Sequence, residues 1–274
     1  MEKNPILNVT DLSSYLYCPR KFYINKVLGL REPANKQMIE GRIRHEILEK
    51  FFNHEKRIVE SFKIPSSKKQ IIKKFQELLE NLMDIIFAKN QEQINDFSIS
   101  KKELRDKINS SMEKEISLRA ESIEQTIERG FLGESLWENL SPKYLSELPL
   151  YSENLGLKGR ADRVLISEEG IIPFELKTRE IEKIWPSDEI QITAYAMLLE
   201  EKHNKQIPLG IIEAGNKKHE IKITIETKKK VTDLIKEIRQ VLDDSIKEQK
   251  NNVKYPPSFS KCQSCPWEET CKEI

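Results

Sequence analysis

The sequence predicts an α/β protein in which a mixed β-sheet is flanked by helices and carries an all-helical insertion. Apolar residues recur at helical spacing over 39–53 and again from about 66 to 140, strand-like segments begin after about 147, and helices return between the later strands. Of the 274 residues, 38% are hydrophobic and 33% charged, and the formal net charge is +1. This composition indicates a globular chain of one large or two small domains, and its net charge by itself indicates no partner.

The first long helix is expected over 39–53, because apolar side chains recur every four residues from Ile39 to Phe51. A helical subdomain should follow, since the spacing stays helical from about 66 to 140 without a proline. This all-helical part therefore comes before the strands, which are expected from about residue 147 onward.

The sheet is expected to begin after the helical part. Strands are expected at 148–152, 157–166 and 171–176, with Glu169-Gly170 as the turn between the last two. The later elements are a helix, two strands and a long amphipathic helix, expected at 188–203, 208–214, 219–225 and 227–248.

Two carboxylates and a lysine fall on neighbouring strands of this sheet. Asp162 ends a Gly-Arg-Ala-Asp segment on one strand, and Glu175 follows thirteen residues later on the next. Because side chains alternate along a strand, Glu175 and Lys177 should point the same way while Leu176 points into the core. Carboxylate oxygens suit Mg²⁺ or Mn²⁺, and such an ion polarises a phosphate and activates a bound water for phosphodiester hydrolysis.

This pattern alone is weak, because a surface ion pair across two strands would look the same in a chain so rich in charge. The apolar residues around it are those of a buried sheet, which places the charges at an edge or in a cleft. Gln191 and Tyr195 lie four apart on the next helix and share a face, suited to a phosphate backbone or to support of the lysine. His45 follows Gly41 by one turn on the first long helix. The simpler alternatives are a satisfied helix face for the pair and a surface or capping role for the histidine.

Four cysteines occupy the two ends of the chain. Cys18 stands alone, and Cys262, Cys265 and Cys271 form a C-x2-C-x5-C group. The start lacks the apolar core of a signal peptide and no apolar run could span a bilayer, so we expect a cytoplasmic protein with reduced thiols and no membrane partner. Four thiolates suit a 4Fe–4S cluster or a structural zinc ion, and sharing one centre would require the termini to meet. An even count also fits disulfides, and Cys18 by itself equally fits a buried thiol.

Six segments occur in a fixed order along residues 12–271. They are YCPRKFY around Cys18, G-x-x-x-H at Gly41 to His45, GRAD at 159–162, ELK at 175–177, Q-x-x-x-Y at 191–195 and the terminal C-x2-C-x5-C. Together they resemble the PD-(D/E)XK nucleases of the RecB type that carry an iron–sulfur cluster. Among these, the chain most resembles the stand-alone CRISPR-associated exonuclease family, the fourth of the CRISPR-associated proteins.

The resemblance implies a restriction-endonuclease-like core with an all-helical insertion and termini clasped by an iron–sulfur cluster. The implied metal ligands are His45, Asp162, Glu175 and the Leu176 carbonyl, and the catalytic residues are Lys177, Asp162 and Glu175. Arg160, Gln191 and Tyr195 are implied to bind or steady the substrate strand, and Cys18, Cys262, Cys265 and Cys271 to hold the 4Fe–4S cluster. The implied division is an N-terminal cluster segment, a helical subdomain, a nuclease core and a C-terminal cysteine segment, at 1–38, 39–146, 147–250 and 251–274.

The implied activity is that of a metal-dependent exodeoxyribonuclease using Mn²⁺ or Mg²⁺. The family degrades single-stranded DNA, often 5′→3′, and trims prespacers for the CRISPR integrase. Two alternatives stay open at this point. One is a recombination or repair nuclease similar to AddB outside CRISPR, and the other is a non-catalytic adaptor that binds DNA ends or the integrase. The oligomeric state is also open.

Overall fold

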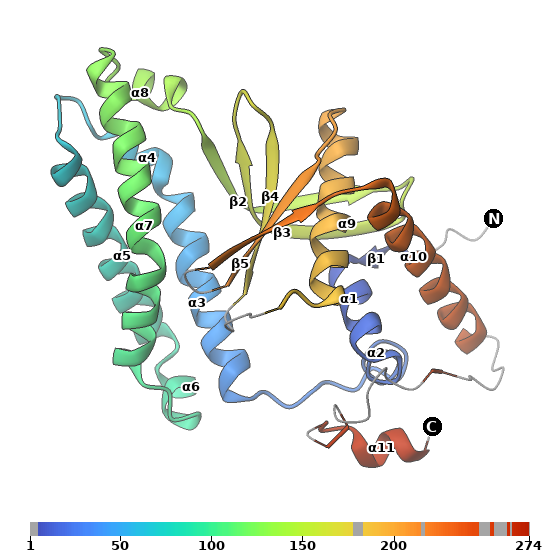
Figure 1. Ribbon diagram of the computed structural model, residues 1–274. Helices are drawn as coiled ribbons and strands as arrows, with labels where there is room; N and C mark the ends of the chain where they lie inside the picture. The colour runs from blue at the N-terminus through green and yellow to red at the C-terminus, as the bar shows by residue number, and fades with distance from the viewer. Residues whose placement is uncertain are drawn as a thin grey trace.

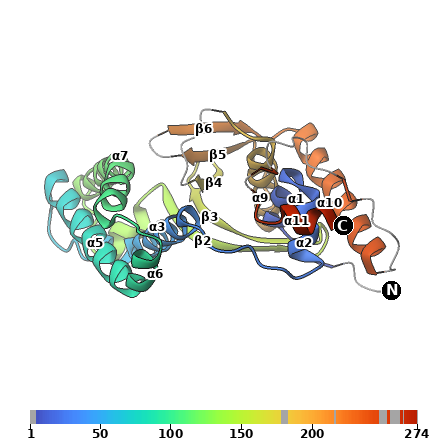
Figure 2. The same cartoon turned by 90° about the horizontal axis from the view of Figure 1, so that it is seen from below.

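A central sheet separates two groups of helices. The computed structural model describes residues 5–177, 183–214, 217–246, 253–254, 262–263 and 265–273. The helices between residues 36 and 139 form a layer on one side of the sheet, and α1 (Val9–Tyr17), α9 (Pro186–His203) and α10 (Ile225–Ile246) cover the other side (Figures 1 and 2).

Six strands of the described residues form one mixed sheet. They are β1 (Leu7–Asn8), β2 (Lys143–Ser152), β3 (Leu157–Ile166), β4 (Ile171–Lys177), β5 (Leu209–Ala214) and β6 (Lys217–Lys222). The order is β1-β3-β4-β5-β6, and β2 pairs with β3. β3 is antiparallel to β2 and β4 and parallel to β1, while β4 is parallel to β5. β3 therefore has β2 along one edge, and β1 and β4 against different parts of the other.

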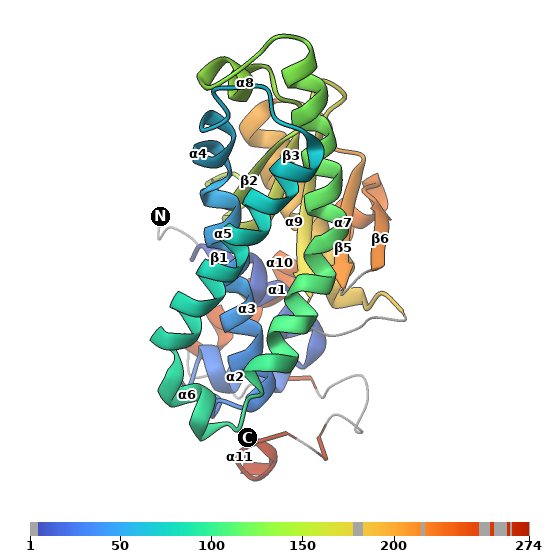
Figure 3. The same cartoon turned by 90° about the vertical axis from the view of Figure 1, so that its left-hand side faces the viewer.

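The helices pack into two separate apolar cores. Those beside the sheet and at the chain ends are α1 (Val9–Tyr17), α2 (Pro19–Lys26), α9 (Pro186–His203), α10 (Ile225–Ile246) and α11 (Glu268–Glu273). The helical layer contains α3 (Lys36–Asn53), α4 (Glu55–Glu60), α5 (Lys68–Lys89), α6 (Gln91–Asp96), α7 (Lys101–Glu128) and α8 (Glu134–Asn139). One core joins the sheet to α1, α9 and α10, and the other lies within the helical layer, where α5 runs beside α7 (Figure 3).

Local sequence accounts for the ends of α9, which later carries part of the site. Pro186 occupies the first turn, where its missing N–H costs no helical hydrogen bond. Asn204 ends the helix in the left-handed conformation with φ of 49°. The expected helix at 188–203 is thus confirmed, and it begins two residues earlier, at Pro186.

Two expected strands differ from the observed ones by a few residues. β2 begins at Lys143 rather than at the expected residue 148. The last strand covers Lys217–Lys222 rather than 219–225, because Thr224 and Thr227 exchange side-chain-to-backbone hydrogen bonds that start α10 at Ile225. The expected end of the last long helix, at 248, lies outside the described residues.

Candidate functional site

The site lies where β3 and β4 stop pairing. The two strands pair from Ile166 opposite Ile171 to Arg163 opposite Phe174. One residue further, the Leu176 N–H donates to the Asp162 Oδ2 at 2.8 Å. The aspartate side chain therefore replaces a backbone partner at the point where the strands part, and its second oxygen is left to face other groups.

His45 on α3 contacts that second oxygen. Its Nε2 lies 3.0 Å from Asp162 Oδ1, and its Nδ1 lies 3.1 Å from Glu147 Oε1 on β2. The three residues can each offer one ligand atom within 4.8 Å of the other two. The hydrogen bond to Asp162 is the main cause that raises the pKa of His45 to about 9. A cation bound by His45 would therefore have to displace a proton from the imidazole.

Glu175 and Lys177 lie on the same side of β4, as alternation predicts. The Lys177 ammonium lies 3.1 Å from Glu175 Oε1, whereas Leu176 packs against the core of the helical layer. The Gln191 amide joins the two, since its Nε2 donates to Glu175 Oε1 at 2.7 Å and its Oε1 accepts from Lys177 at 3.0 Å. Gln191 thus contacts the lysine, as one of its two expected roles requires, and its role in the reaction stays a prediction.

The other oxygen of Glu175 is available for a ligand. Glu175 is 5% exposed, and its Oε2 is buried without a hydrogen-bond partner. Burial, followed by the negative charge of Asp162, raises the pKa of Glu175 to about 8. A hollow of about 610 Å³ opens here, lined in part by Gly41, His45 and Lys177. One imidazole and several carboxylates around an unpaired buried oxygen make a donor set that fits Mn²⁺ or Mg²⁺.

Three residues near the site were not predicted from the sequence. Asp188 is 4% exposed and lies 3.2 Å from the Lys177 ammonium, and its position three residues before Gln191 on α9 is a helical-spacing signal that could have identified it. Arg44 is buried and donates to the Lys177 carbonyl at 3.2 Å, which ties α3 to β4. Glu147 gave no such signal, because the strand was expected to begin one residue after it.

Gly159 allows two helices to approach β3 closely. A Cβ at this position would lie 2.9 Å from the Tyr195 ring and 2.9 Å from a Val9 methyl. Tyr195 is 3% exposed, so in this structure it is a packing residue that holds α9 against the strand. Arg160, next to the glycine, is 61% exposed, and its Nε lies 3.6 Å from Glu147 Oε2. Contact of Arg160 or Tyr195 with a substrate stays a prediction.

The two ends of the chain meet near the cysteines. Arg20 donates to the Val253 carbonyl at 3.3 Å and to the Cys271 carbonyl at 2.6 Å. The Cys18 sulfur accepts a hydrogen bond from the Lys21 N–H at 3.4 Å. Burial raises the pKa of the Cys18 thiol, and its nearness to Cys271 and Cys265 raises it further. This meeting of N- and C-terminal segments is what a shared thiolate centre requires, and the residues present are compatible with one.

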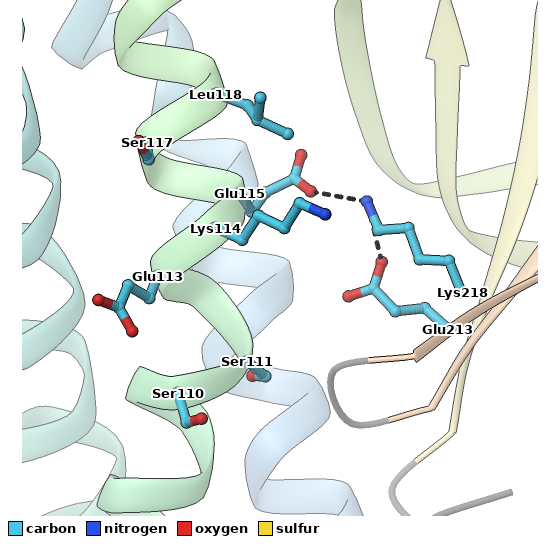
Figure 4. A pocket seen from close by; sticks show the side chains of 9 residues that line it. All are labelled: Ser110, Ser111, Glu113, Lys114, Glu115, Ser117, Leu118, Glu213 and Lys218. Carbon is cyan, nitrogen blue, oxygen red and sulfur yellow. Dashed lines mark hydrogen bonds and ion pairs between the residues drawn. The ribbon is translucent and has the colours of Figure 1, made fainter.

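A second hollow, of about 470 Å³, separates α7 from β5 and β6 (Figure 4). Lys218 lies 3.2 Å from Glu115 Oε2 and 3.8 Å from Glu213 Oε2. Arg163 is 1% exposed, lies 2.7 Å from Glu213 Oε2 and stacks on the Phe174 ring at 4.4 Å. These charges pair with one another across the gap. They form a brace between the helical layer and the sheet, which we call the buried brace (Arg163, Glu115, Glu213 and Lys218).

The chain matches the PD-(D/E)XK nuclease superfamily over residues 6–272. It belongs to that superfamily, which confirms the predicted fold of a mixed sheet flanked by helices and makes the protein a nuclease of this type. Divalent metals are the cofactors of such nucleases, in agreement with the donor set described above.

Two CRISPR-associated exonuclease Cas4/endonuclease Cas1 fusion proteins share sequence with the chain, which confirms the resemblance to CRISPR-associated nucleases. The fusion of Leptospira interrogans (serogroup Icterohaemorrhagiae, serovar Lai, strain 56601) is 31% identical over 110 residues, which are 36% of this chain and 20% of that protein. The fusion of Myxococcus xanthus (strain DK1622) is 42% identical over 62 residues, which are 20% of this chain and 11% of that protein. The matched part of the chain thus spans a fifth or less of the length of these relatives.

The chain also aligns with the crystal structure of an Eubacterium rectale protein that is described as an exonuclease. The alignment covers 96% of this chain and 94% of the other. The identity is 11% and the TM-score 0.42, too low for this likeness to support a conclusion. Within the part of the chain that the structure describes, none of the helices has the length and apolar character needed to cross a membrane.

Proposed function

We propose that this chain is a metal-dependent exodeoxyribonuclease that degrades single-stranded DNA from the 5′ end. We further propose that it acts in the cytoplasm on prespacer DNA ends, in association with the CRISPR integrase. The observation that carries the nuclease site is the convergence of His45, Asp162, Glu175 and Lys177 from three separate elements around an unpaired buried carboxylate oxygen. A non-catalytic adaptor would have no use for this arrangement.

Each residue has a distinct role in the proposed reaction. His45, Asp162, Glu175 and the Leu176 carbonyl would hold Mn²⁺ or Mg²⁺, and the ion would polarise the phosphate and lower the pKa of the attacking water. The hydrogen bond from the Leu176 N–H to Asp162 orients the backbone that carries the Leu176 carbonyl. Lys177, held by Gln191 and Asp188, orients the attacking water or stabilises the charge that develops on the phosphate.

The substrate and the partner are inferred from the relatives and from exposed charge. The two fusion proteins are described as an exonuclease joined to an endonuclease, which supports exonucleolytic chemistry and an association with the integrase. Arg160 is exposed on β3 beside the site, so its guanidinium can contact a backbone phosphate. Gln191 and Tyr195 steady the site from α9, and the helical subdomain at 39–146 forms one wall of the path that the strand follows.

The proposal is tested with single-stranded and duplex DNA labelled at either end, in Mn²⁺, Mg²⁺ or EDTA. We expect stepwise shortening of single strands from the 5′ end in both metals and none in EDTA. Asp162→Asn should lower the rate at least roughly a hundredfold, because it weakens both the ion and the Leu176 contact. Glu168→Gln, in the exposed turn before β4, is the matched control and should cleave normally. Binding of DNA ends without cleavage in any metal would instead support the adaptor.

We also propose that Cys18, Cys262, Cys265 and Cys271 hold a 4Fe–4S cluster that clasps the two termini. Protein purified without oxygen should contain near-equal iron and acid-labile sulfide, and Cys18→Ser should lose both together with thermal stability. One tightly held zinc ion would preserve the four-thiolate centre and contradict the cluster, and two disulfides would contradict both.

A further inference from the structure

Glu147 has a backbone conformation that its position in a strand does not explain. Its φ is 50°, in the left-handed region that non-glycine residues rarely adopt. On either side of it, Ser146 pairs with Arg163 and Leu148 pairs with Ala161. Glu147 therefore stands opposite Asp162 at an interruption of the β2–β3 ladder. Strain of this kind persists only where the surroundings hold it in place, and it is found preferentially at functional sites.

The side chain of Glu147 is aimed at the imidazole of His45. Its Oε1 lies 3.1 Å from His45 Nδ1, while the other ring nitrogen, Nε2, lies 3.0 Å from Asp162 Oδ1. The carboxylate of Glu147 is 11% exposed, and its second oxygen lies 3.6 Å from Arg160 Nε. Each nitrogen of His45 thus has its own carboxylate, supplied by neighbouring strands.

We propose that Glu147 is a positioning residue for the metal centre. With its Oε1 3.1 Å from His45 Nδ1, the negative carboxylate favours a proton on that nitrogen, and so the tautomer whose Nε2 lone pair is available to the ion beside Asp162. Carboxylates on the second nitrogen of a metal-bound histidine act in this way in other metalloproteins. The inference rests on the proposed function, because it requires His45 to bind a cation.

The contacts favour positioning over direct ligation by Glu147. Asp162 and Glu147 touch different nitrogens of one ring, so an ion held by Nε2 together with Asp162 does not share the Glu147 contact. The positive φ of Glu147 also favours the positioning role. An extended residue at this point would direct its side chain to the face of β2 that the regular alternation assigns to it. A left-handed residue turns it toward α3 instead.

Glu147→Gly removes the carboxylate without destabilising the backbone, since glycine accepts the left-handed conformation without cost. Mn²⁺ affinity is measured by calorimetry for the wild type, Glu147→Gly, Glu147→Gln and Asp162→Asn, and folding by thermal melting in EDTA. We expect Glu147→Gly to melt at or above the wild-type temperature and yet to bind Mn²⁺ about 10–100-fold more weakly. Glu147→Gln keeps an acceptor oxygen and should recover part of the affinity, whereas Asp162→Asn should lose more than either. Glu49→Gln also removes one carboxylate charge, from the hollow that His45 lines, and is the matched control, with less than about a threefold change.

The tautomer of His45 gives a second measurement, which would not change if Glu147 had only a structural role. In the Mg²⁺-loaded wild type, ¹⁵N NMR of the ring should show the proton on Nδ1, and Glu147→Gly should lose this preference. If the wild type and Glu147→Gly bind Mn²⁺ equally well and with the same tautomer of His45, the positioning role of Glu147 is overturned while the metal site stands. Loss of affinity as large as that of Asp162→Asn would make Glu147 a ligand and overturn the positioning role. Wild-type protein that binds no Mn²⁺ would overturn the metal site and this inference with it.

Discussion

Arg163 offers the sharpest test of how the helical layer is held to the sheet. Its side chain is 1% exposed, and its guanidinium lies 2.7 Å from Glu213 and 3.9 Å from Glu115. It also stacks on the Phe174 ring at 4.4 Å. Arg163→Met keeps much of the volume and the apolar contact but removes the charge, so two buried carboxylates lose one of the two cations that they share.

The magnitude follows from burial. Removing one partner of a buried ion pair typically costs about 3–5 kcal/mol, because the remaining charge stays buried without compensation. Lys218 still lies within 3.8 Å of both carboxylates and is 42% exposed, so it can screen them in part. We therefore expect about 3 kcal/mol, near the lower limit. At roughly 2–4 °C per kcal/mol for a chain of this size, the melting temperature should fall by roughly 6–12 °C.

The assay is thermal and denaturant unfolding followed by circular dichroism. Arg160→Met, on the same strand but 61% exposed, is the matched control and should change the free energy of unfolding by no more than about 0.5 kcal/mol. Arg163→Met combined with Glu213→Gln should cost less than the sum of the two single changes, since the second removes a charge that the first has orphaned. If Arg163→Met melts within about 2 °C of the wild type, the buried brace does not stabilise this fold as argued.

Four further predictions concern the site and its surroundings. Mn²⁺ affinity should rise between about pH 6 and pH 9, because the metal must displace protons held by His45 and Glu175. Asp162 raises the pKa of His45 to about 9, and burial raises the pKa of Glu175 to about 8. Calorimetry in buffers of different ionisation enthalpy measures the proton release, and an affinity that does not change with pH would contradict the prediction. Because the same groups bind more protons in the folded than in the unfolded chain over this range, metal-free protein should lose stability as the pH rises. Gly159→Ala should destabilise by about 1–3 kcal/mol in thermal melts, since its methyl group would overlap two packed side chains, and an unchanged melt would show that α1 and α9 can shift. Lys177→Met should abolish DNA cleavage while leaving Mn²⁺ binding intact by calorimetry, and its normal cleavage would exclude the lysine from catalysis.

The sequence by itself determined the elements whose residues repeat with a clear period. Apolar spacing located α3 and α9 to within a few residues, and alternation placed Glu175 and Lys177 on one side of β4, because both depend only on the geometry of a single helix or strand. The order of the short motifs then led to His45 and Asp162, which the structure brings to 3.0 Å of each other.

Tertiary structure alone decided which residues complete the site and what holds it together. Glu147 reaches His45 only because one residue of β2 adopts a positive φ opposite Asp162. Helical spacing places Asp188 on the face of α9 that carries Gln191, but only the packing of α9 across Gly159 brings it to Lys177. The buried brace depends on α7 meeting β3 and β5, which are separated from it by tens of residues. These contacts arise from strand register and from the angle at which layers pack, and neither leaves a periodic signal in the residues of one element.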